Sequence, residues 1–277
     1  MDKPEEVKLP RQTKIDNQKS AFTLVELLVV ISIITLLLSI LLPVMARTRG
    51  QAKQAVCKNN IRQLGLANAG YAHDNAGAYV IGSTDILTEN TNRWYGTRPD
   101  KNTTFDTKKG ALSNYMDIAK LACPQNVLYY KLNPNESDYD SWNGGYGYNF
   151  VYIGSKIWIA GYENSSCKSA AKDTALRNPA QTLMFADTAM LKKENLIEYS
   201  FAEPRYFLSG GRPNPGWDPS PSLHFRHLNK TNICWSDNHI SSEKLVKTGV
   251  INENGTNPAD FSLGWFSPAD NSQFDLE

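Results

Sequence analysis

The sequence has no large excess of charge of either sign. Its 277 residues carry 29 Lys and Arg against 28 Asp and Glu, a formal net charge of +1. A protein dedicated to nucleic acid needs surplus basic side chains to neutralise phosphates. The balance therefore excludes that class, and we expect no nucleic-acid partner.

Cysteine is scarce, and the short motifs of common active sites are absent. The 4 cysteines, Cys57, Cys123, Cys167 and Cys234, lie too far apart for a CxxC redox or zinc motif. The G-x-S-x-G elbow of serine hydrolases does not occur. We therefore predict no enzymatic activity, no cofactor and no metal.

Charged residues are almost missing from one stretch. Residues 22–42 read FTLVELLVVISIITLLLSILL, and Glu26 is their single charged side chain. As a helix at about 1.5 Å per residue this stretch spans roughly 31 Å, the thickness of the hydrocarbon core of a bilayer. Its length and uniformity favour a membrane-spanning helix over a buried helix of a soluble core.

A polar stretch, residues 1–21, precedes this apolar run. An ordinary secretory signal has a short basic head, an apolar core of about 7–15 residues and a small-residue cleavage site after that core. Here the core is longer, and residues 43–47 (PVMAR) are a poor match for such a site. A simple signal peptide is therefore not predicted.

Glu26 lies near the start of the apolar run. A charged side chain in hydrocarbon costs on the order of 3 kcal/mol or more, so such a carboxylate needs a partner or a purpose. Two interpretations stay open. Glu26 lies at the interface and reaches water, or it pairs with a positive charge in the membrane, which a new N-terminus before Phe22 of a neighbouring subunit would supply.

Residues 19–26 (KSAFTLVE) resemble the prepilin processing site of type IV pilins and type II secretion pseudopilins. The resemblance implies that a prepilin peptidase cuts between Ala21 and Phe22 and then methylates the new amino group of Phe22. It also implies that Glu26 aligns the chain with other pilin-like subunits during assembly. Ala21 stands where the family usually has Gly, and we expect this nearest small substitute to permit cleavage.

The resemblance also supplies the location and the function. Five basic residues flank each end of the apolar run, so charge counting does not decide the orientation. The resemblance implies a single pass through the lipid of the inner (cytoplasmic) membrane, an extracytoplasmic C-terminal domain and a structural role in a short filament of a secretion or pilus-type system. The alternative is a membrane-anchored module that binds surface glycans through tryptophans in or near predicted loops, Trp94, Trp142, Trp158 and Trp217.

The predicted fold is α+β, with a long N-terminal helix packed on a mainly antiparallel sheet that carries long loops, as in pilins. Pro43 should kink or locally melt the helix, which continues to about Tyr71 or Ala72. Residues 146–153, 182–186 and 232–236 are typical of strands, and residues 88–110, 131–146 and 203–222 are predicted loops. The predicted parts are a cleaved leader (1–21), a transmembrane segment (22–42), an extracytoplasmic helix (43–76) and a β-rich domain (77–277).

The stretch from His227 to His239 resembles the "His, nine residues, Asp-Gly" motif of a group of bacterial prepilin-like proteins. Asp237-Asn238 replaces Asp-Gly, and Asn tolerates the left-handed conformation that a hairpin turn needs. His227, Asp237 and His239 have side chains that suit a metal. We favour a hairpin capped by Asp237 and Asn238, with His227 hydrogen-bonded to it.

Two cysteines invite a disulfide. Cys57 lies on the face of the predicted helix that also carries Ile61, Leu64 and Tyr71, and Cys123 follows an apolar patch. Outside the cytoplasm disulfides are allowed, and a bridge would fasten the helix to the domain. The bridged and unbridged alternatives both stay open.

Overall fold

The computed structural model describes residues 23–126, 143–192, 194–209, 212–213, 219–246 and 255–276. The chain divides into two compact units, Met1–Arg47 and Thr48–Glu277. Helix α1 (Leu24–Asp74) begins in the first unit and ends in the second.

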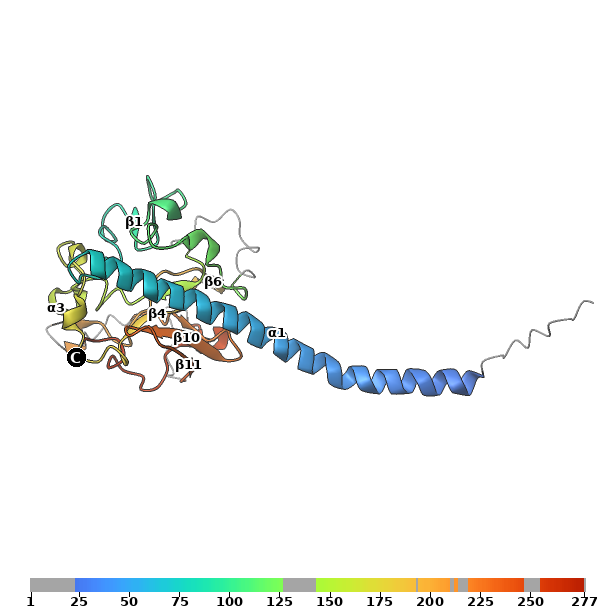
Figure 1. Cartoon of the computed structure of the whole chain (residues 1–277). Helices are drawn as coiled ribbons and strands as arrows, with labels where there is room; N and C mark the ends of the chain where they lie inside the picture. Colours follow the sequence, from blue (N-terminus) through green and yellow to red (C-terminus); the bar gives the residue numbers. More distant parts are fainter. Residues whose placement is uncertain are drawn as a thin grey trace, which may run out of the picture. The chain divides into compact units, whose positions relative to one another are not determined.

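The second unit combines the end of α1 with short strands and single helical turns (Figure 1). Its strands are β1 (Asn92–Arg93), β2 (Gly96–Thr97), β3 (Tyr146–Tyr148), β4 (Leu183–Asp187), β5 (Met190–Lys192), β6 (Asn195–Ile197), β7 (Leu208–Ser209), β8 (Arg212–Pro213), β9 (Leu223–His224), β10 (Lys230–Trp235), β11 (Ile240–Lys244) and β12 (Leu263–Gly264). Its short helices are η1 (Thr107–Lys109), η2 (Ile118–Lys120), α3 (Ile157–Ala160), η3 (Ser166–Lys168), η4 (Asp173–Ala175) and η5 (Pro258–Phe261).

Four strands form the central sheet, in the order β11-β10-β4-β3. Each neighbouring pair is antiparallel, and so are the four two-stranded pairs around the sheet. Since side chains alternate between the two faces of a strand, the register places one set on a common face. This set comprises Tyr146 and Tyr148 of β3, Phe185 and Asp187 of β4, and Asn232 and Cys234 of β10.

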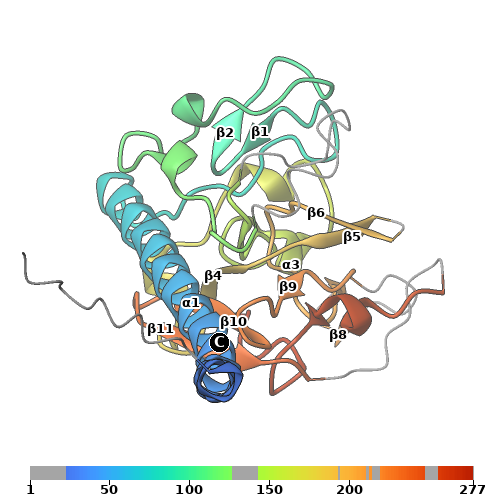
Figure 2. The same cartoon turned by 90° about the vertical axis from the view of Figure 1, so that its right-hand side faces the viewer.

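Helix α1 covers that face within the second unit, and Figure 2 shows it crossing the sheet beside β4 and β10. Gln54 donates hydrogen bonds to Asn232 of β10 and Ser242 of β11. Further along the helix, about two and four turns after Gln54, Asn60 and Asn68 donate to the hydroxyls of Tyr146 and Tyr148. The predicted α+β fold, a long helix on a mainly antiparallel sheet, is confirmed.

Gly65 lets the helix lie close to the end of β10 and the turn after it. A Cβ atom at this position would lie 2.4 Å from the sulfur of Cys234 and 2.5 Å from Oδ1 of Asn238. Only a residue without a side chain allows this contact, because real Cβ atoms do not come so near.

Several predicted boundaries differ from the observed ones. The strand predicted to reach residue 153 ends at Tyr148, because the side chain of Asn149 bonds to the carbonyls of Leu183 and Phe274 and turns the chain out of the ladder. Helix α1 runs without interruption through Pro43, so the helix does not melt there. A bend at Pro43 stays a prediction.

Candidate functional site

The described part of the N-terminal segment starts with a capped helix. Thr23 precedes α1, and its hydroxyl accepts a hydrogen bond from the backbone N–H of Glu26 at 3.2 Å. In return, the Glu26 carboxylate accepts from the backbone N–H of Thr23 at 2.8 Å and from its hydroxyl at 2.7 Å. This reciprocal pair is a capping box, which satisfies donors that the first turn of a helix leaves free. The T-x-x-E spacing of Thr23 and Glu26 therefore has a local structural role, which is to cap the start of α1.

The first half of α1 is exposed along its whole length, from Leu24 to Arg49. Its most apolar window of 18 residues contains 0% buried residues, and Leu24 is 80% exposed. Such a surface is unfavourable in water and favourable in lipid. By length and composition, α1 is the one helix among the described residues that could cross a membrane.

Ala21 and Phe22, the predicted cleavage and methylation residues, lie outside the described residues. Trp142 and Trp217, two of the four tryptophans considered for glycan binding, lie outside them as well. Trp94, by contrast, is 0% exposed and packs against Tyr95 and Phe185. It is a core residue, which removes it as a sugar-stacking surface.

The structure brings Cys57 and Cys123 together inside the second unit. Cys57 faces inward from α1, Cys123 lies in the loop after η2, and their sulfur atoms are 2.7 Å apart and buried. The backbone N–H of Cys123 donates to the carbonyl of Gly144. Gly144 has φ +72°, and a Cβ there would lie 2.4 Å from the carbonyl oxygen of Leu121. Glycine at this turn thus lets the loop reach the helix.

Three further polar residues surround this cysteine pair. Asp187 lies at the end of β4 on the face toward α1, and its Oδ1 accepts from Arg226 at 3.0 Å. Its Oδ2 accepts from the backbone N–H of Asn232 at 2.8 Å and lies 3.4 Å from Nε2 of His227. The same nitrogen is 3.5 Å from the sulfur of Cys123. We call Cys57, Cys123, Asp187, Arg226 and His227 the buried cluster.

The charges of the buried cluster offset one another. Burial raises the pKa of the Asp187 carboxyl, but the Arg226 guanidinium and His227 outweigh it, so the net pKa is lowered. Burial likewise raises the pKa of Cys123, while its hydrogen bond with Cys57 and the charge of Arg226 lower it below the ordinary value. The pKa of Cys57 rises, first because of that hydrogen bond and then because of burial. In the reduced pair Cys123 is therefore the more acidic thiol.

Sequence reasoning missed Asp187 and Arg226. An acidic residue directly after the apolar strand 182–186 and a basic one beside His227 were the available signals. Neither could be interpreted alone, because their meeting depends on the register of β4 against β10.

His227, Asp237 and His239 do not meet as a metal site. Asp237 and His239 lie in the exposed turn between β10 and β11, where Nδ1 of His239 is 2.6 Å from the Asp237 carboxylate. Asn238 has φ +68°, the left-handed conformation expected for the hairpin. His227 lies just before Lys230, the first residue of β10, and so at the end of the strand away from this turn. It contacts Asp187, so the expected hydrogen bond between His227 and the hairpin turn was wrong.

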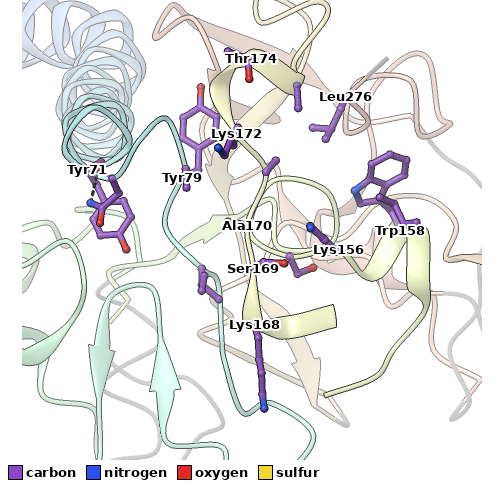
Figure 3. A pocket seen from close by; sticks show the side chains of 17 residues that line it. Tyr71, Tyr79, Lys156, Trp158, Lys168, Ser169, Ala170, Lys172, Thr174 and Leu276 are labelled. Carbon is purple, nitrogen blue, oxygen red and sulfur yellow. Dashed lines mark hydrogen bonds between the residues drawn. The ribbon is translucent and has the colours of Figure 1, made fainter. Parts of the chain in front are cut away.

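A separate cavity of about 650 Å³ opens in the second unit (Figure 3). Tyr71 and Tyr79 lie on one side of it, and Trp158 and Leu276 on the other. Its size falls in the range of small-molecule sites. Three exposed lysines also line it, namely Lys156, Lys168 and Lys172.

Residues 16–42 match a family model described as the prokaryotic N-terminal methylation motif. The match includes Ala21, Phe22, Glu26 and the apolar run, and it supports a type IV pilin-like, membrane-anchored protein. It does not extend to residues 227–239. No curated protein and no solved structure matches the chain.

Proposed function

We propose that the chain is a pseudopilin or type IV pilin-like structural subunit of a short filament in a secretion or pilus-type system. The observation that carries the proposal is the match of residues 16–42 to the methylation motif. Prepilin peptidase removes residues 1–21 and methylates Phe22. Residues 22–42 anchor the subunit in the inner membrane, with residues 77–277 as an extracytoplasmic domain. The role is structural rather than enzymatic.

Glu26 acts in the assembly of the filament. Its carboxylate pairs with the methylated amino group of Phe22 on a neighbouring subunit, which relieves the cost of a charge in hydrocarbon. The hydrogen bonds from Thr23 fix the side chain at the first turn of α1, so the carboxylate is positioned before the neighbour arrives. The apolar side chains around α1 then pack against the helices of other subunits.

The N-terminus of the mature chain tests this function. Mass spectrometry of the protein extracted from its native membrane should find an N-terminus at methylated Phe22. A matched pair of variants tests the cleavage site. Ala21→Gly should be processed at least as fully as the native chain, whereas Ala21→Leu, with its bulky side chain, should stay unprocessed. An intact start at Met1 in both the native chain and Ala21→Gly would refute the proposal.

One observation favours a second candidate, a membrane-anchored module that binds glycans. Trp158 lines the cavity of about 650 Å³, and aromatic faces stack on sugar rings. Under this alternative Trp158→Ala should abolish binding on a glycan array, while Trp158→Phe should retain part of it. Loss of binding without loss of filament incorporation would assign the cavity to a ligand rather than to assembly.

A further inference from the structure

We propose that the reduced chain binds one Zn²⁺ ion in the buried cluster, through the sulfurs of Cys57 and Cys123, an oxygen of Asp187 and Nε2 of His227. This structural metal site fastens α1 to the sheet. It lies wholly in the second unit and does not depend on the proposed membrane function.

The first support is the convergence of four donor atoms. One ligand atom from each of the four residues lies within 4.8 Å of all the others, and all four residues are buried. A tetrahedral zinc ion with bonds of about 2.0–2.3 Å separates its ligand atoms by roughly 3.3–3.8 Å, so small side-chain movements suffice. Four protein ligands and no exposed position are typical of a structural rather than a catalytic zinc site.

The second support is the balance of charge. Two thiolates cancel the two charges of the ion, and Arg226 cancels Asp187, while His227 stays neutral as a ligand must. The filled site is therefore neutral overall, as a buried site requires. The guanidinium of Arg226 bonds to Oδ1 of Asp187, which leaves Oδ2 as the oxygen on the side of His227 and Cys123.

The third support is the way in which the ligands are held. Metal-bound carboxylates and imidazoles usually have a second layer of hydrogen bonds. Asp187 has this layer in Arg226 and the backbone N–H of Asn232. Nδ1 of His227 has no hydrogen-bond partner among the described residues, and this unpaired group costs less than zinc coordination supplies.

The sulfur distance connects the metal site with the Cys57–Cys123 disulfide that the sequence left open. The observed 2.7 Å lies between a disulfide bond of about 2.05 Å and the roughly 3.8 Å of two sulfurs on zinc. Oxidation by a small-molecule or protein disulfide joins the two sulfurs and transfers two electrons to the oxidant. The oxidant takes up two protons from water and leaves as two thiols, and Zn²⁺ is released. Only the reduced chain therefore binds the metal.

Cobalt titration tests the site, because Co²⁺ replaces zinc and reports thiolate ligands in its absorption spectrum. The full chain in detergent is reduced, stripped of metal and titrated with Co²⁺ without oxygen. We expect saturation at one equivalent, thiolate-to-cobalt charge-transfer bands, the intense visible bands of a tetrahedral ion, and displacement by one equivalent of Zn²⁺.

Variants and oxidation give the controls. Cys57→Ser and Cys123→Ser should each weaken binding at least 100-fold, whereas Cys167→Ser, equally buried but outside the cluster, should bind like the native chain. The native chain oxidised with a small disulfide should lose two titratable thiols and all cobalt binding, and a reductant should restore both; this arm needs no mutation.

Three outcomes would overturn the proposal: no cobalt spectrum with the reduced native chain, bands that survive in both cysteine variants, or saturation only well above one equivalent. None of them alters the N-terminus found at Phe22, so the metal site and the pilin-like function fail separately.

Discussion

Glu26 accepts hydrogen bonds from Thr23 at the start of its own helix. We also propose that it pairs with an amino group of another subunit. The two roles need different chemistry. A cap needs only an acceptor oxygen, which glutamine also provides, whereas pairing with an amino group in hydrocarbon needs the negative charge. A single substitution can therefore separate them.

We predict that Glu26→Gln keeps α1 and membrane insertion intact but loses filament incorporation. Thr23→Ala should weaken the start of α1 but keep filament incorporation. It removes the hydroxyl of the cap, at a cost of about 1 kcal/mol, and leaves the carboxylate charged. Membrane fractionation and cross-linking of assembled filaments measure both properties. Normal incorporation of Glu26→Gln would show that the charge has no role in assembly.

Single residues also show how far sequence reasoning reaches. Cys57 was placed on the inward helix face by its spacing with Ile61 and Leu64, and all three are buried. That Asp187 would lie below it could not be predicted, because this contact joins α1 to β4 across 130 positions and depends on strand register. His227 was selected for its motif, but its partners are set by the tertiary structure.

At the scale of elements, the contact between α1 and β10 depends on Gly65. We predict that Gly65→Ala destabilises the second unit by up to about 2 kcal/mol, because crowding against Cys234 costs about 1–3 kcal/mol and the gain in helix propensity returns about 1 kcal/mol. Denaturant unfolding in detergent, monitored by tryptophan fluorescence, measures the change.

Gly50→Ala on the same helix is the matched control. A Cβ there would meet Leu228 at 3.4 Å, an ordinary contact, so this variant should gain about 0.5–1 kcal/mol. Equal effects of the two substitutions would show that helix propensity alone matters and that the close approach at Gly65 does not.

The loop before β1 is organised by one carboxylate. Asp85 accepts hydrogen bonds from the backbone N–H and hydroxyl of Thr91, at 2.8 and 2.6 Å, and from the backbone N–H of Asn92 at 3.0 Å. Partial burial raises the pKa of Asp85, but these hydrogen bonds outweigh it, so the net pKa lies below the ordinary value. The ionised form therefore stabilises the loop.

This shift predicts a pH dependence. A carboxyl with a lowered pKa adds to the free energy of unfolding above the ordinary value of about 3.9 and loses that contribution as the pH falls further. Asp85→Asn should cost about 1 kcal/mol at pH 7, a modest figure because the group is partly solvated, and progressively less as the pH falls below about 3.9. Unfolding of both proteins between pH 3 and 7 measures the difference in their free energies of unfolding.

Glu89→Gln, an exposed change in the same loop, is the control and should have no effect. A difference for Asp85→Asn that stays constant with pH would refute the electrostatic origin of the stabilisation.

At the scale of the whole molecule, the fold class was predictable because it follows from composition along the chain. One apolar run, an amphipathic continuation and short apolar segments between turns define a long helix on a sheet. The pairing of the strands was not predictable. The central sheet joins β3, β4 and β10 from residues 146 to 235, and their order depends on contacts between distant residues that no local pattern contains.

The division of apolar surface between the two units gives the last prediction. The buried hydrophobic cluster begins at Cys57 and lies wholly in the second unit, whereas the large apolar side chains from Leu24 to Leu42 are exposed. Since the core does not use the apolar run, a fragment of residues 48–277 should be soluble without detergent and unfold in one cooperative transition. The full chain should need detergent, because exposed apolar surface of this extent associates in water.

A second fragment, residues 62–277, is the control. It lacks Cys57 and Ile61, both 0% exposed, and losing core side chains of this kind costs several kcal/mol, so it should not fold. Light scattering and urea unfolding distinguish the three chains. Aggregation of the 48–277 fragment would mean that the apolar run completes the core and is not a membrane anchor.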